Sequence, residues 1–213
     1  MRPAVARTGR VARAAEWTAW LVGASLLIMH STSALWAQYA GSLSAAQLEQ
    51  SRRTGLTVAH PDQSLWAATR IKEYDRARLM PVPVAEAVIR IRSVSLEVPV
   101  FEGATDLHMT LGAGRVPGSP GFGQPGNVGI SSHRDGHFRK LKDIRVGDRI
   151  VVETRSASYL YEVDEILITD PSDTTVLWPG SRPELTLVTC YPFYYRGRAP
   201  QRFVVRAVLV PEE

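Results

Sequence analysis

The chain has 213 residues, a formal net charge of +4 and one cysteine. This length allows one domain of about 100–150 residues with further segments, and the ordinary globular composition excludes disorder throughout. The positive charge is unevenly spread, because four arginines precede the first acidic residue, Glu16. The sequence after this basic end favours a membrane topology signal over a nucleic-acid partner.

An uncharged stretch follows the basic end. No Asp, Glu, Lys or Arg occurs from Trp17 to Leu48, and the span from Trp17 to Trp36 has the length and the terminal aromatic residues of a membrane helix. A cleaved signal peptide, with small residues near Ala34 or Ala37, is the alternative. We favour a retained anchor because the uncharged stretch is longer than a signal-peptide core. Both interpretations place the remainder of the chain outside the cytoplasm.

The sequence predicts four segments. Residues 1–16 form a basic cytoplasmic tail, 17–37 a transmembrane anchor, 38–84 a stalk or N-terminal appendage that packs on the domain, and 85–211 the folded domain. The appendage is polar and only partly helical in pattern.

From Ala87 onward, short apolar and β-branched runs alternate with turn signals. The pattern predicts one or two strands within 88–100 and strands at 149–153, 159–168, 184–190 and 202–210, with a loop rich in glycine and proline at 112–129. His108 precedes a strand-like stretch. Many short strands with little helical pattern predict an all-β barrel or sandwich.

Cys190 stands near the end of one of these strands. Pro192 removes a backbone donor and should end the strand just after the cysteine, so that the thiol reaches a cleft from a rigid support. A free cysteine is often a small buried core residue. Exported proteins normally pair their cysteines, however, and a lone one is either an intermolecular bridge or a thiol kept for its chemistry.

A reactive thiol needs a base or a cationic neighbour, and two histidines are candidates. His133 and His137 follow an apolar alternation that ends at Ile130, and strand ends often carry site residues. Asp135 lies near enough in sequence to hold either ring. From spacing alone, both histidines fit solvated loop residues equally well. A zinc site made with Cys190 would lack a fourth ligand and any recognised spacing.

Arg202 opens the last predicted strand, which would pair with the cysteine strand across a short connection. A guanidinium there can donate to the oxyanion of a tetrahedral intermediate. The alternative is a solvent-facing arginine at a barrel edge, which Arg196, Arg198 and Arg206 fit equally well.

Together these stretches resemble the sortases, cysteine transpeptidases of bacterial surfaces. The family's Thr-Leu-x-Thr-Cys motif is present as Thr186 to Cys190, its catalytic histidine corresponds to His133 and its catalytic arginine to Arg202, in the family's order. The similarity covers roughly residues 87–210. The Cys-Tyr-Pro-Phe continuation is most similar to class D sortases or to the group from Gram-negative bacteria. Ser132 stands where many members have glycine.

The resemblance implies an all-β fold, a closed barrel of about eight strands with short helices, preceded by a membrane helix. It also implies a mechanism. Cys190 would attack the threonine carbonyl of a Leu-Pro-x-Thr-Gly or Leu-Pro-x-Thr-Ala signal and form a thioester. His133 would act as general acid and base, and Arg202 would stabilise the oxyanion. No metal or cofactor is required by this chemistry, although some sortases bind calcium.

The implied partners are a protein with a C-terminal sorting signal and an amine acceptor, from peptidoglycan or a protein, at the cell envelope. The signal would contact Val188, Thr189 and Tyr191 together with the loop 172–183. Two alternatives stay open. One is a cysteine peptidase in which water resolves the thioester, and the other is a non-catalytic exported barrel that binds peptides.

Overall fold

The computed structural model describes residues 60–195 and 197–211. Its helices are α2 (Ala68–Ala77) and α3 (Asp106–Leu111), with three short 3₁₀ helices, η1 (Arg92–Val94), η2 (His137–Asp143) and η3 (Thr175–Leu177). Its strands are β1 (Ala87–Ile91), β2 (Leu96–Glu102), β3 (Ala113–Arg115), β4 (Gly126–Ser131), β5 (Arg149–Thr154), β6 (Ser158–Thr169), β7 (Pro183–Tyr191) and β8 (Gln201–Leu209).

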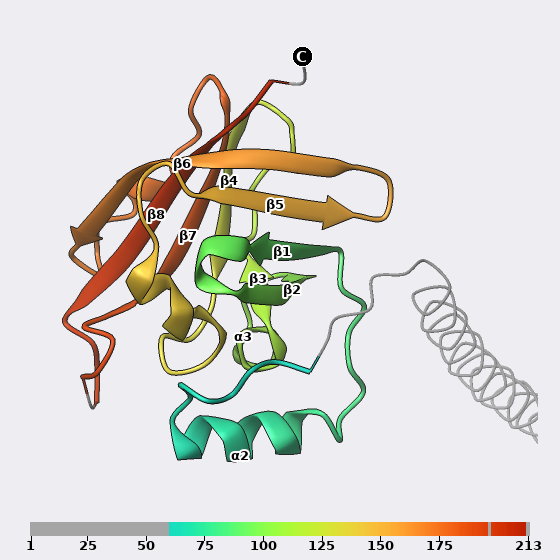
Figure 1. Ribbon diagram of the computed structural model, residues 1–213, viewed down its shortest axis with the longest axis vertical. Coiled ribbons are helices and arrows are strands. Elements are labelled where there is room, and N and C mark those ends of the chain that lie inside the picture. The colour runs from blue at the N-terminus through green and yellow to red at the C-terminus, as the bar shows by residue number, and fades with distance from the viewer. Residues whose placement is uncertain (1–59, 196, 212–213) are drawn as a thin grey trace, which may run out of the picture. The chain divides into compact units, whose positions relative to one another are not determined.

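The eight strands close into a barrel in the order β1-β2-β3-β4-β7-β8-β6-β5 (Figure 1). β1 pairs antiparallel with both β2 and β5, and this last pairing closes the ring. Two pairs are parallel, β2 with β3 and β4 with β7. The predicted all-β barrel of about eight strands is therefore confirmed, and the sandwich alternative is wrong.

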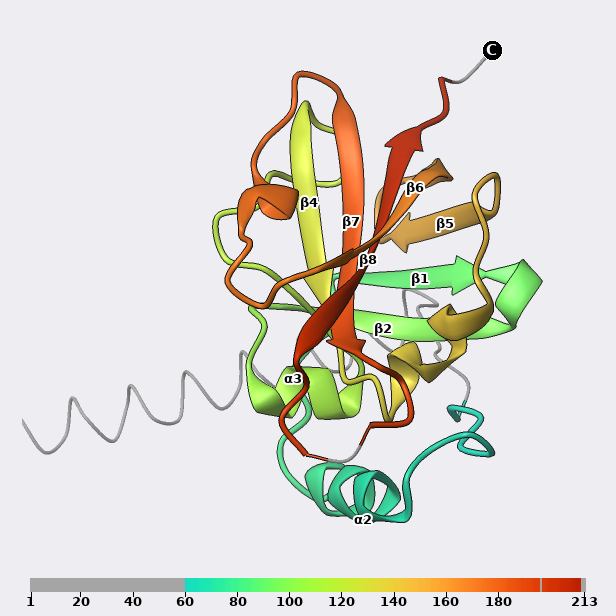
Figure 2. The same cartoon turned by 90° about the vertical axis from the view of Figure 1, so that its left-hand side faces the viewer.

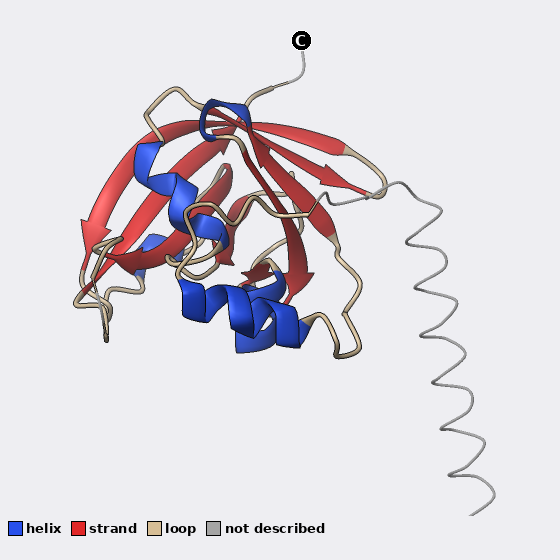
Figure 3. Ribbon diagram, turned by 60° about the horizontal axis from the view of Figure 1, so that its bottom comes forward, coloured by secondary structure: helices blue, strands red, loops and turns tan. Residues whose placement is uncertain are grey.

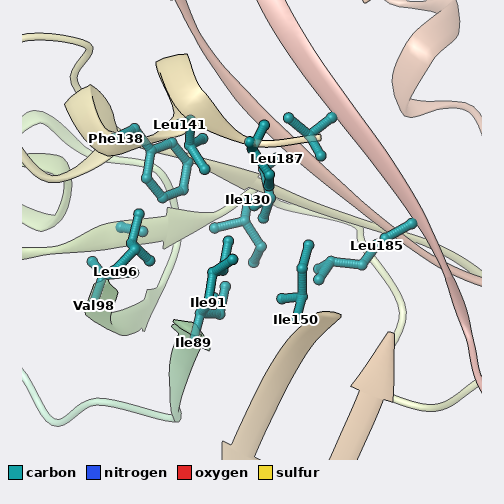
Figure 4. Packing of buried hydrophobic residues seen from close by; sticks show 14 of the residues in the cluster. Ile89, Ile91, Leu96, Val98, Ile130, Phe138, Leu141, Ile150, Leu185 and Leu187 are labelled. Atoms are coloured by element: carbon teal, nitrogen blue, oxygen red, sulfur yellow. The ribbon is translucent and has the colours of Figure 1, made fainter. Parts of the chain in front are cut away.

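The period-2 alternation that predicted the strands also fills the barrel. In β7, Leu185 and Leu187 are fully buried inside, and they lie opposite Val128 and Ile130 of β4 in the core. Figure 4 shows Leu185, Leu187 and Ile130 converging with isoleucines from β1 and β5. Burying a side chain of this size contributes about 1.5–3 kcal/mol, so the apolar face of each strand fixes its register.

The η2 segment packs on the same core. Phe138 and Leu141 are fully buried and Ile144 is 6% exposed, and all three belong to the barrel's apolar cluster. The connection that leaves β4 is thereby held against the barrel at the end where β4 and β7 finish.

Two elements differ from the sequence prediction. β3 and the start of β4 lie inside the stretch 112–129 that was expected to be loop. β3 begins with two small residues, Ala113 and Gly114, and a Cβ at Gly114 would come within 2.5 Å of the Cα of Ala104. Close packing therefore replaces the apolar periodicity that marks longer strands. His108 lies in α3, whose cap Thr105 accepts a hydrogen bond from the His108 backbone N–H at 3.2 Å, and the strand that follows it, β3, begins only at Ala113.

Residues 60–84 belong to the same compact unit as the barrel. Tyr74 and Ala77 of α2 are buried against Phe101 and Leu111, with Trp66 packed on the same cluster. Figure 3 shows α2 beside α3 on one side of the barrel. None of the helices in the described ranges has the length and apolar character that crossing a bilayer requires. The predicted anchor, residues 17–37, lies outside those ranges.

Candidate active site

Cys190 and Arg202 face each other across two neighbouring strands. They are Cα partners in the antiparallel β7–β8 ladder, so their Cβ atoms lie about 4.5–5.5 Å apart on one face. The preceding residue of β7, Thr189, points into the barrel and is 2% exposed, which turns Cys190 outward, where it is half-buried. The Arg202 side chain thus leaves the sheet on the same outer face as the thiol, and its Nη1 donates to the Gln201 carbonyl at 3.2 Å.

His133 is held beside β7 by the residue before it. β4 and β7 run parallel, and at their ends the Ser132 N–H donates to the Val188 carbonyl at 3.3 Å. In return, the Thr189 hydroxyl donates to the Ser132 carbonyl at 2.8 Å. Figure 2 shows β4, β7 and β8 side by side, with α3 and α2 beyond the end at which β7 finishes. Cys190 and Arg202 therefore lie on the neighbouring strands β7 and β8, and His133 lies on the connection that leaves the adjacent strand β4 at the same end of the barrel.

Ser132, which stands where many sortases have glycine, stabilises the end of β4. It is 3% exposed, and its hydroxyl donates to the Gly112 carbonyl at 2.6 Å. This bond ties the end of β4 to the turn between α3 and β3. The serine therefore strengthens the support under His133.

The surroundings of His133 favour its neutral form. Burial of the ring, followed by the charge of Arg70, lowers the pKa of His133, while Asp106 and Asp135 act in the opposite direction. Nε2 lies 3.2 Å from Asp106 Oδ1, within ion-pair distance, and the side chain is 20% exposed. A neutral imidazole can accept a proton, which is the requirement for a general base.

The predicted role of Asp135 as holder of the histidine ring is wrong. Its Oδ1 lies 3.1 Å from Nε of Arg70, and the carboxylate beside the His133 ring belongs to Asp106, the first residue of α3. The only sequence signal for Asp106 is its position after the capping residue Thr105, which marks a helix start and says nothing about the partner.

His137 is not a solvated loop residue. It is 6% exposed, and its ring lies edge-on against Trp66 at 4.6 Å and Tyr74 at 5.9 Å between centroids. The ring therefore packs under the appendage, which leaves His133 as the candidate catalytic histidine.

The buried ring of His137 predicts a pH-dependent stability. Burial lowers the pKa of His137 to about 3, so between about pH 6.5 and 3 the unfolded chain binds a proton that the folded protein does not. The free energy of unfolding is expected to decrease as the pH falls through this window, by at most about 1.4 kcal/mol per pH unit from this group.

Urea unfolding between pH 7 and pH 4 measures this dependence. His137→Gln, which cannot titrate, is expected to flatten the slope relative to the wild type. His60→Gln, at an exposed position, is the matched control and should keep the wild-type slope. Equal slopes for wild type and His137→Gln would contradict the assignment.

The three residues predicted to contact a signal have different environments. Val188 is half-buried on the outer face with Cys190. Tyr191 stacks on Phe203 at 6.2 Å and meets Phe193 at 6.0 Å, which places it in the aromatic cluster at the barrel end. Thr189 is buried and bonded to Ser132 as described above. Contact of these residues with a peptide stays a prediction, and the structural role of Thr189 is to align the histidine connection.

Sequence reasoning missed Asn127. This residue is 4% exposed, and its amide donates to the carbonyls of Val176 at 2.9 Å and Trp178 at 3.4 Å. Its carbonyl accepts from the Thr186 hydroxyl at 2.7 Å. Asn127 therefore fastens the β6–β7 connection over the outer face of β4 and β7, and Gly129 leaves room there for the side chain of Leu177.

A cleft of about 650 Å³ opens on the histidine side of the site. Its walls come from the start of α2, from the connection after His133 and from the β7–β8 connection. The residues lining it are Ala67, Ala68, Thr69, Arg134, Asp135, Arg139, Phe193, Tyr194, Tyr195 and Gly197. Arg134 donates to the carbonyls of Tyr195 at 2.8 Å and Gly197 at 2.9 Å, and the Arg139 guanidinium lies 4.1 Å from the centroid of the Tyr194 ring. These two arginines therefore hold the β7–β8 connection that forms one wall of the cleft.

An eight-stranded barrel that presents cysteine, arginine and a neutral histidine from adjacent strand ends has the groups needed for acyl transfer through a thioester. The comparisons identify the family. Residues 89–210 match the Sortase domain, which is more than half of the chain, and the protein belongs to the sortase family.

Among curated relatives, Sortase D of Bacillus subtilis is 30% identical over 122 residues, covering 57% of this chain and 62% of that protein. Sortase A of Bacillus anthracis is 29% identical over 126 residues, covering 57% of this chain and 58% of that protein. The chain therefore spans less than two thirds of the length of these relatives.

Solved sortase structures share the fold. The Clostridium perfringens Sortase D5 transpeptidase matches with a TM-score of 0.55 and 27% identity, over 66% of this chain and 89% of that one. A lid mutant of Sortase A from Corynebacterium diphtheriae has a TM-score of 0.55 at 24% identity, over 81% and 96% of the two chains. This second likeness shows the fold alone.

Proposed function

We propose that the protein is a cysteine transpeptidase that cleaves a sorting signal of the Leu-Pro-x-Thr-Gly or Leu-Pro-x-Thr-Ala type after threonine. The observation that carries the proposal is the register of β7 with β8, which places Arg202 directly opposite Cys190, with His133 tied to the same strand end. The Cys190 thiolate attacks the threonine carbonyl, and Arg202 stabilises the negative charge that develops on its oxygen.

His133 serves both halves of the reaction. The neutral ring first takes the proton of the Cys190 thiol, and the resulting imidazolium gives this proton to the leaving amine as the thioester forms. The ring, neutral again, then takes a proton from the incoming amine. The lowered pKa of His133 supports both steps, because the imidazolium is a stronger acid and the neutral ring is the major form at pH 7. We place the incoming amine in the cleft on the histidine side, because Arg134 and Asp135, which directly follow His133, line it.

The proposed location is the cell envelope, where sortases act. The chain would be held by a single-pass anchor at residues 17–37, with residues 1–16 in the cytoplasm, residues 38–84 as the stalk and appendage, and the catalytic barrel of residues 85–211 outside. The support is the charge pattern of the N-terminal sequence. Mature protein beginning near Gln38 in envelope fractions would replace this proposal by a cleaved signal peptide.

The deciding experiment incubates the protein with Leu-Pro-x-Thr-Gly and Leu-Pro-x-Thr-Ala peptides, with and without an added amine, and identifies the products by mass. The expected product with amine is the threonine-amine conjugate. A free threonine carboxylate in both arms would identify a peptidase, and failure of both peptide cleavage and thiol labelling of Cys190 would favour a non-catalytic peptide-binding barrel.

The β6–β7 connection is expected to help hold the signal. Asn127→Ala removes the donor to two carbonyls of this connection and leaves the buried Thr186 hydroxyl without its acceptor. The free energy of unfolding should therefore drop by about 1–3 kcal/mol, and KM for the peptide should rise. Thr186→Val is the matched control, because it removes one hydrogen bond to Asn127 but keeps both bonds to the connection.

Denaturant unfolding and peptide kinetics separate the two variants. Both are expected to lose stability, and only Asn127→Ala is expected to raise KM. An unchanged KM in Asn127→Ala would remove the connection from signal binding.

A further inference from the structure

Arg70 lies on α2, in the appendage that precedes the matched Sortase domain, yet it contacts the catalytic connection. Its side chain is only 13% exposed. Nε donates to Asp135 Oδ1 at 3.1 Å, and Nη1 lies 2.7 Å from Glu73 Oε2 and 3.4 Å from the Thr110 hydroxyl. One guanidinium thus joins α2, α3 and the connection that carries His133.

Two further contacts hold the same connection to α2. The Ala67 N–H donates to the Asp135 carbonyl at 3.1 Å. Gly136 is buried, and a Cβ at this position would lie 3.2 Å from Arg70 Cγ and 3.8 Å from His133 Cβ. The aliphatic part of Arg70 therefore packs over the turn that follows the catalytic histidine.

We propose that Arg70 is a positioning residue of the active site, which fixes the connection carrying His133 through Asp135 and sets the charge around the ring. Helix α2 of the appendage then contributes to the geometry of the catalytic centre, in addition to linking the barrel to the proposed anchor. Neither the family match nor the sequence motifs include this residue. The kinetic consequence rests on the proposed function, whereas the effect on the His133 ring does not.

The contacts of the Arg70 guanidinium are not needed to attach α2 to the barrel. The helix already buries Tyr74 and Ala77 in the apolar cluster with Phe101 and Leu111. A buried ion pair contributes little to stability compared with apolar packing of the same volume, because removing charges from water is costly. The fork of Arg70 instead supplies directed bonds, which define where the Asp135 segment lies.

The charged groups around His133 determine in which direction its pKa moves when Arg70 is replaced. Asp106 approaches from α3, Asp135 lies on the same connection, and both raise the pKa of His133, while burial and Arg70 lower it. The buried ring of His137 lies on the following 3₁₀ helix, and Cys190 stands on β7. Without Arg70 the two carboxylates act without an opposing cation, so the pKa of His133 moves upward.

The test uses three variants of the full chain. Arg70→Gln removes the charge and the fork, Arg70→Lys keeps the charge and loses the fork, and Arg76→Gln removes a charge from an exposed position of the same helix. The readouts are the titration of the His133 ring, followed by NMR with labelled histidine, and kcat and KM with a sorting-signal peptide.

Arg70→Gln is expected to raise the pKa of His133 and to lower kcat by about 10- to 100-fold with little change in KM, the scale for a misplaced catalytic group. Arg70→Lys should keep the titration near that of the wild type and recover only part of kcat. Arg76→Gln should match the wild type in both readouts.

An unchanged titration and kcat in Arg70→Gln, or equal effects in Arg76→Gln, would overturn the proposal. If Arg70→Gln does not fold, Asp135→Asn replaces it, and this variant must lower kcat and lower the pKa of His133 for the proposal to stand. If the wild type cleaves no sorting peptide, the proposed function fails, while the ring titration still decides the role of Arg70.

Discussion

Replacement of Cys190 by alanine is expected to abolish thioester formation and amine transfer while leaving the fold intact. The thiol is the group that attacks the carbonyl, and no other cysteine exists in the chain to replace it. Because Cys190 lies half-buried on the outer face of β7, loss of its sulfur should cost only on the order of 1 kcal/mol in the free energy of unfolding.

Mass spectrometry of the protein after incubation with a sorting peptide measures the acyl-enzyme, and denaturant unfolding measures the stability. Thr189→Val offers a control for local disruption, because it changes the neighbouring residue and breaks the bond to Ser132 but keeps the thiol. This variant should form the thioester more slowly. Turnover that persists in clean Cys190→Ala would remove Cys190 from the mechanism.

Most of the strands, and the placement of Cys190 opposite Arg202, were predictable because their signals are local. Alternation with a period of two specifies which side chains enter the core, and this local rule places Cys190 and Arg202 on the same outer face once their strands pair. Pro192 marks the strand end in the same local way. The family resemblance then proposes His133 as the catalytic histidine without any knowledge of distances.

The supporting residues were not predictable because their partners are remote in sequence. Arg70 meets Asp135 across 65 positions, and Asn127 meets Val176 across 49. Arginine, aspartate and asparagine are common on surfaces, so nothing in their own surroundings shows that a fold will bury them. His137 was misjudged for the same reason, because the rings that cover it come from the appendage.

The assignment of the catalytic histidine and arginine is tested by replacing each candidate and a control residue, and these remote contacts determine which control substitutions are suitable. His137→Ala would open a cavity beneath Trp66, so His137→Gln is the cleaner choice. Arg206 pairs with Glu165 at 3.2 Å and with the 9%-exposed Glu184 side chain at 3.4 Å, so Arg206→Lys, which keeps the charge, is preferred to alanine.

His133→Ala and Arg202→Ala are each expected to lower turnover by at least about 10²-fold, the scale of a lost acid–base group or oxyanion donor. His137→Gln and Arg206→Lys should cost far less. Arg206 lies opposite Thr186, four residues and about 13 Å along the strand from the pair of Arg202 with Cys190, too far to share one oxyanion. Kinetics on one sorting peptide, with folding checked by circular dichroism, compare all four variants. Greater sensitivity at His137 or Arg206 would show that the catalytic residues are assigned wrongly within the correct family.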